Sequence, residues 1–303
     1  MEYIVETNQL TKQFGKEKAV DGVEIRIPKG EIYGFLGPNG AGKTTTIRML
    51  LGLMRPSSGS VHLFGKDLKN NRIAILKRVG SLVENPSYYP HLTAYENLEA
   101  IRKIVDVPRA RMKEVLKLVR LQDAANKKVK GFSLGMKQRL GIAAALLHQP
   151  ELLILDEPTN GLDPSGIIEM RKLIKQLPEK YGITVVISSH LLSEVDQMAT
   201  TVGVISKGKM IFQDSIEAMR RIAQASIHLR VNDPKAVHQA LLVYGQKADI
   251  KENSVAIQTT ADEEVASIVQ YLVEQGFAIY RVEEEKRSLE NIFLEMTKEE
   301  QIR

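Results

Sequence analysis

The stretch Gly37-Pro38-Asn39-Gly40-Ala41-Gly42-Lys43-Thr44 decides the fold of this chain. It matches the pattern G-x-x-x-x-G-K-[ST], which is typical of loops that bind nucleotide phosphates. A short apolar run, Ile32 to Leu36, precedes the stretch, and residues 44–53 follow it with helical spacing. The pattern therefore predicts a strand, a loop and a helix in the order that the motif requires. An ordinary glycine-rich turn would need neither Lys43 nor Thr44.

The chemistry of this stretch suits a nucleoside triphosphate. Glycines let backbone N–H groups turn inward around a phosphate, and the N-terminus of the following helix adds its dipole. Lys43 supplies a point charge, and the Thr44 hydroxyl can ligate Mg²⁺. We therefore expect ATP and Mg²⁺ as ligands. The predicted cofactor-binding residues of this loop are Gly37, Pro38, Asn39, Gly40, Ala41, Gly42, Lys43, Thr44 and Thr45.

An acidic pair, Asp156 and Glu157, follows the apolar run Leu152 to Leu155. A buried strand would deliver the pair to the carboxyl edge of a sheet, where ligands bind in α/β folds. We expect Asp156 to hold Mg²⁺ and Glu157 to orient or deprotonate the attacking water. By itself the pair could merely cap a turn. Together with the phosphate loop it predicts ATP hydrolysis.

Repeated strand and helix patterns indicate an α/β fold with a mainly parallel sheet covered on both faces. An antiparallel β subdomain is expected from residues 4–14 and 23–27, and a helical subdomain from residues 93–126. The further units are a helix over 133–148 with Ser133 at its N-cap, a strand over 152–155, a helix over 167–177, a strand over 184–188, a helix over 191–198 and a hairpin over 202–212.

A change in composition near Ser215 predicts two domains, residues 1–214 and residues 215–303. The first carries a net charge of +9 and the second a net charge of −4. Beyond the boundary, the pattern over residues 226–283 has the order β-α-β-β-α-β, which is ferredoxin-like. A last helix is expected over 288–297. We therefore expect an ATPase domain followed by a small α+β accessory domain.

Composition excludes several classes of function. The chain has no cysteine, so disulfides, thiolate-bound zinc and a cysteine nucleophile are excluded. The longest apolar stretches, such as Gly141 to Leu147, fall far below the roughly 20 residues that cross a bilayer. Basic residues are dispersed, are not interleaved with aromatics, and Trp is absent, so nucleic acid is not an expected partner.

The segment Phe132-Ser133-Leu134-Gly135-Met136-Lys137-Gln138 precedes Asp156 by about twenty positions. With the phosphate loop and the acidic pair, it resembles the signature element of ABC ATPases, which reads Leu-Ser-Gly-Gly-Gln. Ser133 and Gly135 match that element, whereas Phe132, Leu134 and Met136 depart from it. The resemblance covers about residues 2–220. It implies that Ser133 and Gly135 bind the γ-phosphate of ATP held by a second ATPase subunit in a homodimer, although Ser133 could also be a plain N-cap.

Three further segments resemble family elements. Asn160 to Asp163 is similar to the loop that crosses the dimer interface, although by itself it would be a turn. His190, which follows a predicted strand, is similar to the switch histidine that contacts the γ-phosphate and is a predicted catalytic residue. Phe14 matches the aromatic that stacks on adenine. Tyr is more usual there, and Phe14 could simply belong to the core.

Glu84 departs from the family pattern, in which most members have Gln. That residue links the nucleotide site to the membrane partner, and a carboxylate there can approach Mg²⁺ or water. Glu84 is therefore a predicted catalytic and metal-binding residue. Glu84, the Ser-Leu-Gly-Met signature and the ending 288–295 together resemble the bacitracin-resistance and lantibiotic-immunity branch of bacterial exporters.

The resemblance implies a motor in which two copies sandwich two ATP molecules. Integral membrane permease subunits would dock near residues 84–95, and the chain would lie at the cytoplasmic face of the membrane. A rival class is a soluble ABC protein of DNA repair or translation, but such proteins usually carry tandem ATPase domains, coiled coils, zinc modules or basic extensions. A third possibility is a regulatory ATPase whose C-terminal domain binds a small molecule.

Overall fold

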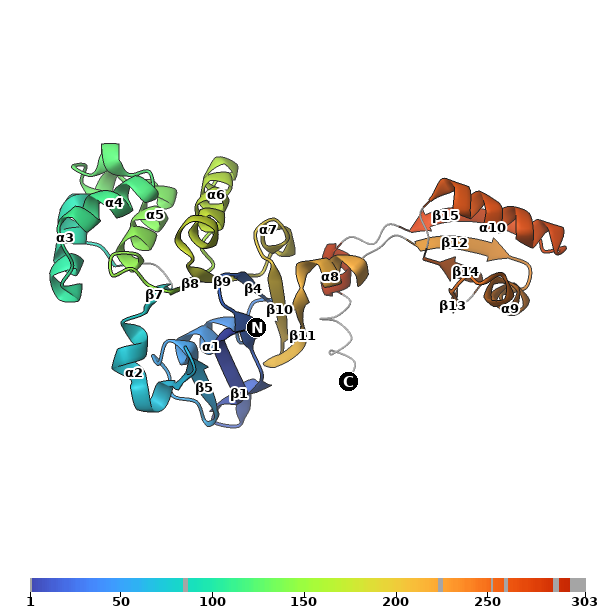
Figure 1. The fold of residues 1–303 in the computed structure, drawn as a ribbon, viewed down its shortest axis with the longest axis horizontal. Coiled ribbons are helices and arrows are strands. Elements are labelled where there is room, and N and C mark those ends of the chain that lie inside the picture. The colour runs from blue at the N-terminus through green and yellow to red at the C-terminus, as the bar shows by residue number, and fades with distance from the viewer. Residues whose placement is uncertain are drawn as a thin grey trace. The chain divides into compact units, whose positions relative to one another are not determined.

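A computed structural model describes residues 2–83, 87–222, 226–251, 253–258, 261–285 and 289–294. The chain divides into two compact units, of which the first ends at Ile216 and the second begins at Glu217. Figure 1 labels most of the helices and strands of both units.

The first unit is built on a six-stranded sheet with the order β11-β10-β4-β9-β8-β7. Neighbouring strands run parallel except for β11, which forms an antiparallel hairpin with β10. Leu36 pairs with Ser189 and Asp156 with Ser188, so β4, β8 and β9 end level with one another. The strands are β4 (Ile32–Leu36), β7 (Val79–Leu82), β8 (Leu152–Asp156), β9 (Thr184–Ser189), β10 (Thr201–Ser206) and β11 (Lys209–Ser215).

The central strands are buried along their length, as strands covered on both faces must be. Helix α1 (Lys43–Leu50) packs against β8, and α6 (Pro164–Tyr181) packs against β9. The short helix α7 (Leu192–Asp196) packs against both β4 and β9. Since helices cover the strands, the functional groups are left to the loops at the strand ends.

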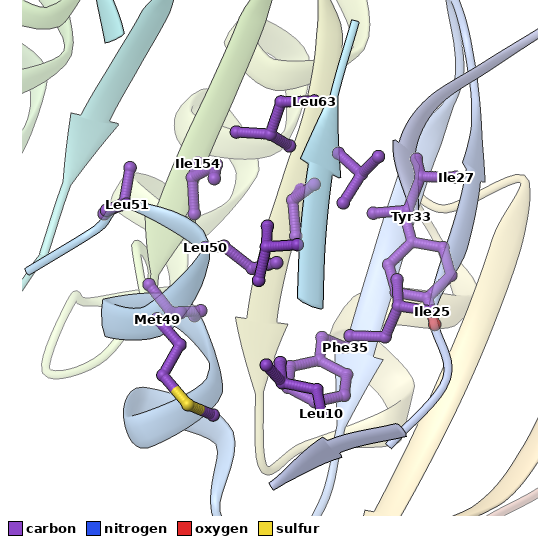
Figure 2. Close-up of a cluster of buried hydrophobic side chains, with 14 of the residues drawn as sticks. Leu10, Ile25, Ile27, Tyr33, Phe35, Met49, Leu50, Leu51, Leu63 and Ile154 are labelled. Carbon is purple, nitrogen blue, oxygen red and sulfur yellow. The ribbon is translucent and has the colours of Figure 1, made fainter. Parts of the chain in front are cut away.

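An antiparallel sheet covers part of this framework. Its strand order is β2-β1-β5-β6, and β3 also pairs with β1. Figure 2 shows the shared core, in which Leu10 and Leu63 of the antiparallel sheet face Phe35 of β4, Leu50 of α1 and Ile154 of β8. This core fixes the start of α1 relative to both sheets. The strands are β1 (Tyr3–Phe14), β2 (Glu17–Val23), β3 (Arg26–Pro28), β5 (Ser58–Leu63) and β6 (Lys66–Asp67).

A helical subdomain contains α3 (Ala94–Val105), α4 (Ala110–Leu118), two short 3₁₀ turns (Gln122–Ala124 and Val129–Gly131) and α5 (Leu134–Ala145). Thr93 and Glu96 form a capping box at the start of α3. The predicted N-cap Ser133 is confirmed, because its side chain accepts a hydrogen bond from the Met136 N–H. The helix predicted over 133–148 ends earlier than expected, since only residues up to Ala145 are helical.

Helix α2 (Leu68–Leu76) and strand β7 of the first unit were absent from the sequence prediction. Helix α2 begins at the N-cap Asp67 and buries only Leu68 and Ile75. Strand β7 is four residues long and contains Gly80 and Ser81, which are poor strand formers. Both lack the sustained apolar periodicity on which the prediction relied.

The second unit begins with α8 (Ile216–Ile222), whose first residue still belongs to the first unit. Its antiparallel sheet has the order β13-β14-β12-β15, and its elements follow one another as β-α-β-β-α-β. The apolar core includes Leu229, Leu241 and Leu272. Of the last predicted helix, residues 289–294 are described and helical. The elements are β12 (Ser226–Val231), α9 (Pro234–Tyr244), β13 (Ala248–Lys251), β14 (Ser254–Ile257), α10 (Asp262–Glu274) and β15 (Ile279–Glu285).

Candidate active site

The phosphate loop connects β4 to α1, as the sequence predicted. Gly42 is the N-cap of α1 and has a φ of 107°, a conformation that favours glycine. A Cβ atom on Gly42 would lie 2.5 Å from the carbonyl oxygen of Ala19, and one on Gly37 would lie 2.4 Å from that of Ile205. Because the backbone on both sides is this close, the loop accepts only glycine at these two positions.

Lys43 is the cation at the centre of the loop. Its ammonium donates to the carbonyl oxygens of Gly37, at 2.7 Å, and Pro38, at 3.3 Å. It also lies 3.5 Å from Oε1 of Glu157, and only 6% of its side chain is exposed. Burial lowers the pKa of Lys43, and the carboxylates of Glu157 and Asp156 oppose this shift. A phosphate would replace the loop carbonyls as the partner of this buried cation.

Asp156 lies at the end of β8, where two hydroxyl groups hold its carboxylate. Thr44 Oγ1 donates to Oδ2 at 3.0 Å, and Ser188 Oγ donates to Oδ1. Ser188 Oγ also accepts a hydrogen bond of 2.9 Å from the backbone N–H of Glu157. Sequence reasoning missed Ser188, although its place at the end of an apolar parallel strand was the signal that could have found it.

Glu157 links the loop lysine to His190. Its Oε2 lies 2.9 Å from Nδ1 of His190, while Oε1 faces Lys43. The backbone of Glu157 has a φ of 49°, in the left-handed region that residues other than glycine rarely adopt. Such a conformation costs on the order of 1–3 kcal/mol and persists only where the surroundings enforce it. The structure thus brings together Lys43, Thr44, Asp156, Glu157 and His190, all of which the sequence had singled out.

The pair Thr44 and Asp156 fits a magnesium ion. Both offer oxygen ligands, which Mg²⁺ prefers, and their oxygens are already within hydrogen-bonding distance. Over the described ranges there is no cluster of three or more His, Cys, Asp or Glu side chains that could hold a metal. Mg²⁺ usually binds through one or two carboxylates plus substrate phosphates, so the donor set suits a metal that arrives with its nucleotide. Glu84 lies outside the described residues.

Ser133 and Gly135 belong to a different group of residues. They line a pocket of about 400 Å³ together with Gly161 and Asp163 of the predicted interface loop. Asp163 caps α6 by accepting from the Gly166 N–H, and its hydrogen bond from Ser165 Oγ helps lower its pKa. The lining of this pocket includes no residue of the phosphate loop.

Phe14 is the last residue of β1, and 51% of it is exposed. The alternative that Phe14 belongs to the core is therefore wrong. The Lys12 ammonium lies 5.3 Å from the centre of its ring, within the range of a cation–π contact. One face of an aromatic ring is thus available on the surface of the antiparallel subdomain.

A glycine-rich loop between a parallel strand and a helix, with an acidic pair at the end of a neighbouring strand, defines a P-loop nucleoside triphosphatase. The family model described as ABC transporter matches residues 20–160. The bacitracin transport ATP-binding protein BcrA of Bacillus licheniformis is 43% identical over 303 residues, which cover 98% of each chain. The chain therefore belongs to the family of ABC transporter ATP-binding proteins.

Two further relatives extend the comparison. The lantibiotic transport ATP-binding protein SrtF of Streptococcus pyogenes is 40% identical over 221 residues, which cover 73% of this chain and 95% of that protein. A solved ATP-binding cassette, a dimer in a post-hydrolysis state bound to ADP and Pi, has a TM-score of 0.63 and 27% identity. The similarity covers 70% of this chain and 98% of that one.

These comparisons confirm the predicted family, the fold class of the ATPase unit and the activity. The chain is the ATP-binding and hydrolysing subunit of an ABC transporter, and proteins of this family work with membrane permeases and form dimers. The comparisons do not favour a role in DNA repair or translation. None of the helices in the described ranges is both long and apolar enough to cross a membrane. The roles of individual site residues stay predictions.

Proposed function

We propose that this chain powers an exporter that removes a peptide antibiotic of the bacitracin or lantibiotic class. The names of the relatives BcrA and SrtF support this class of substrate. The match to BcrA spans nearly the whole chain, whereas the match to SrtF covers 73% of it. A protein similar along its whole length shares the second unit as well as the ATPase unit. Bacitracin-like peptides are therefore the first candidates, with residues 215–303 as an accessory domain.

The observation that carries the proposal is the continuous chain of contacts from Lys43 through Glu157 to His190, beside the Thr44–Asp156 pair. In this arrangement Lys43 binds the β- and γ-phosphates in place of the loop carbonyls. Glu157 orients or deprotonates the attacking water. The ring nitrogen Nδ1 of His190 is engaged with Glu157, which leaves Nε2 to face the γ-phosphate.

Thr44 and Asp156 would hold Mg²⁺. When bound, the ion would neutralise charge on the β- and γ-phosphate oxygens. Ser188 fixes the orientation of the Asp156 carboxylate before the nucleotide arrives. Most of the catalytic effect in phosphoryl transfer comes from such positioning, because the transition state needs little covalent assistance. Glu84 stays a candidate for the same region.

A second copy of the chain would complete each site. Ser133 is exposed at the N-terminus of α5, a 12-residue helix, and a helix N-terminus favours bound anions. In a homodimer, Ser133 and Gly135 of one copy would contact the γ-phosphate bound to the Lys43 loop of the other. The dimeric solved cassette supports this arrangement. Phe14 would stack on the adenine through its exposed ring.

Separate permease subunits would supply the path across the membrane, docked near residues 84–95 on the cytoplasmic side. The relatives named as transport ATP-binding proteins support this division of labour. Residues 84–86 of the expected docking segment lie outside the described ranges.

The test is to reconstitute the chain with its membrane partner in vesicles and to measure ATP hydrolysis with and without added peptide. Bacitracin or a lantibiotic should stimulate turnover, whereas an unrelated cationic peptide of similar size should not. The Glu157→Gln variant in the same vesicles should hydrolyse at a background rate under all conditions. Equal stimulation by all peptides would contradict the proposed substrate class. Parent-like turnover by Glu157→Gln would contradict the proposed role of Glu157.

A further inference from the structure

Three buried polar side chains belong to the segments that follow Glu157 and flank His190. They are Thr159, Ser189 and Glu194, whose exposed fractions are 4%, 4% and 8%. Thr159 lies two residues after Glu157, and Ser189 immediately precedes His190. Glu194 belongs to α7, between the buried apolar residues Leu192 and Val195. None of the three was predicted from the sequence to be a site residue.

One oxygen of Glu194 joins the two segments that carry the catalytic pair. Oε2 accepts a hydrogen bond of 2.5 Å from Thr159 Oγ1 and one of 3.2 Å from Ser189 Oγ. Ser189 Oγ in turn accepts a hydrogen bond of 3.0 Å from the Leu191 N–H. The segment after β8 and the segment after β9 are thus tied to a single carboxylate.

Thr159 also stands between Glu157 and the predicted interface loop. The Asn160 N–H donates to the Glu157 carbonyl oxygen at 3.1 Å, and the Leu162 N–H donates to the Thr159 carbonyl oxygen at 3.1 Å. These bonds make residues 157–162 a run of tight turns. The Thr159 side chain anchors this run to Glu194, so a displacement of residues 160–163 that moves Thr159 would break this bond.

Burying polar groups costs free energy unless each finds a partner, so an apolar cluster would serve packing equally well at this place. Glu157 meanwhile holds a strained φ of 49°, which its neighbours must enforce. On one side, Ser188 Oγ accepts the Glu157 N–H. C-terminal to Glu157, the backbone is anchored by the hydrogen bond from the Thr159 side chain to Glu194.

We propose that Glu194 is a positioning residue for ATP hydrolysis. Through Thr159 and Ser189 it holds the Glu157 carboxylate against His190 and couples the interface loop to that pair. The inference rests on the roles proposed above for Glu157 and His190. Without the anchor, the turn after Glu157 relaxes and its carboxylate leaves the position needed for the attacking water. Nucleotide binding depends on the phosphate loop, whereas the Glu194 carboxylate accepts hydrogen bonds from Thr159 and Ser189.

The experiment uses the full-length chain and measures kcat and KM for ATP together with Tm. The variants are Thr159→Val, Glu194→Ala, their double variant and Thr159→Ser. We expect kcat to fall about tenfold in Thr159→Val and in Glu194→Ala, with KM within about twofold of the parent. The double variant should be no slower than the slower single variant, because both remove the same bond. Thr159→Ser keeps the hydroxyl and should retain parent-like kcat.

Thr7→Val is the matched control. Thr7 is 5% exposed, and its hydroxyl donates to the Val23 carbonyl oxygen at 2.9 Å and accepts from the Ile25 N–H at 2.8 Å. It is therefore a buried threonine that bridges β1 and residues 23–25, and both of these bonds go to groups outside the Glu157–His190 region. This variant should lower Tm while leaving kcat unchanged, which separates lost stability from lost positioning.

Several results would overturn the inference. One is a lower Tm with unchanged kcat in Thr159→Val and Glu194→Ala, which would give the cluster a structural role only. Another is full additivity in the double variant, since independent effects cannot arise from one shared bond. If Glu194→Ala fails to fold, Thr159→Val carries the test alone, because valine keeps the shape of threonine.

A parallel measurement on Glu157→Gln keeps the two proposals apart. If Glu157→Gln is inactive while Thr159→Val and Glu194→Ala turn over like the parent, only the inference about Glu194 fails. If Glu157→Gln hydrolyses ATP like the parent, the role of Glu157 fails, and the inference about Glu194 fails with it.

Discussion

Replacing Ser188 by alanine tests the geometry of the site more directly than replacing a charged residue. The Ser188 side chain is fully buried. Its hydroxyl donates to Asp156 Oδ1 and accepts the Glu157 N–H at 2.9 Å. Alanine keeps the strand and the register of β9 but removes both bonds. The variant therefore loosens the two acidic residues together without altering any charge.

The expected loss of stability follows from these two bonds. A buried group left without its hydrogen-bond partner costs about 1–3 kcal/mol, and a bond to a charged acceptor lies at the upper end of that range. Asp156 is only partly buried, so water replaces some of the lost interaction. We therefore expect the free energy of unfolding to fall by about 2 kcal/mol, which lowers Tm by about 4–8 °C in a domain of this size.

The loss of ATPase activity should be larger than the lowered free energy of unfolding alone would cause. With the Asp156 carboxylate free to rotate, the pair that would hold Mg²⁺ loses its fixed orientation, and Glu157 loses the bond that supports its left-handed backbone. We expect kcat to fall at least tenfold and the Mg²⁺ concentration for half-maximal activity to rise several-fold. The assay is steady-state ATP hydrolysis at 25 °C, titrated with MgCl₂, beside thermal unfolding with and without Mg-ATP.

Thr184→Val is the control on the same strand. Thr184 is fully buried at the start of β9, and its hydroxyl accepts a hydrogen bond of 2.8 Å from the Gly30 N–H. The Thr184→Val variant should lose free energy of unfolding comparable to the contribution of one buried hydrogen bond. It should keep both kcat and the Mg²⁺ dependence of the parent. Parent-like kcat and Mg²⁺ dependence in Ser188→Ala would refute the argument that this hydroxyl organises the site.

Three further predictions concern other groups. Glu157→Gln should lower kcat more than a hundredfold while ATP still binds. Size-exclusion chromatography with ATP should therefore show a stable dimer, and a monomer under these conditions would contradict an active site shared between two copies. Phe14→Ala should raise KM for ATP a few-fold with kcat unchanged, whereas Phe14→Tyr should behave like the parent in the same assay. The Arg78 guanidinium binds both carboxylate oxygens of Glu151 and holds the pKa of Glu151 below its usual value. This exposed pair therefore stabilises the fold above the unfolded pKa of about 4.3 and loses its effect as the pH falls through the lower folded pKa. The stability difference between parent and Arg78→Gln, below about 1 kcal/mol from this ion pair at pH 6, should therefore narrow in urea titrations as the pH falls below about 4.

Local sequence patterns predicted most of the framework because its central elements have clear patterns in the sequence. The run Ile32–Leu36, the glycine motif and the start of α1 are adjacent in the chain, so their contacts follow from local geometry. Strand β7 was missed for the opposite reason. It is short, and what makes it a strand is its parallel pairing with β8, about 70 residues further along the chain.

The same distinction separates the site residues that were foreseen from those that were missed. Lys43, Asp156 and Glu157 carry charge at motif positions, and the chemistry of a triphosphate calls for them. Thr159 and Glu194 lie 35 residues apart, and neither is unusual in its own segment. Their bond depends on how β8 and β9 align, which only tertiary structure determines. Sequence patterns therefore found the groups expected to touch the nucleotide and missed the groups that hold them in place.

The two serines at the end of β9 show how strand register makes this difference. Ser188 and Ser189 are adjacent and chemically identical, yet side chains of successive strand residues point to opposite faces of a sheet. Asp156 pairs with Ser188 in the register of β8 and β9, so the Ser188 hydroxyl reaches the Asp156 carboxylate. Ser189 faces the other way and donates to Glu194 on α7. A slip of one residue would turn the Ser188 hydroxyl to the opposite face of the sheet and remove it from Asp156. The alignment of these two buried strands is therefore itself a determinant of the active site.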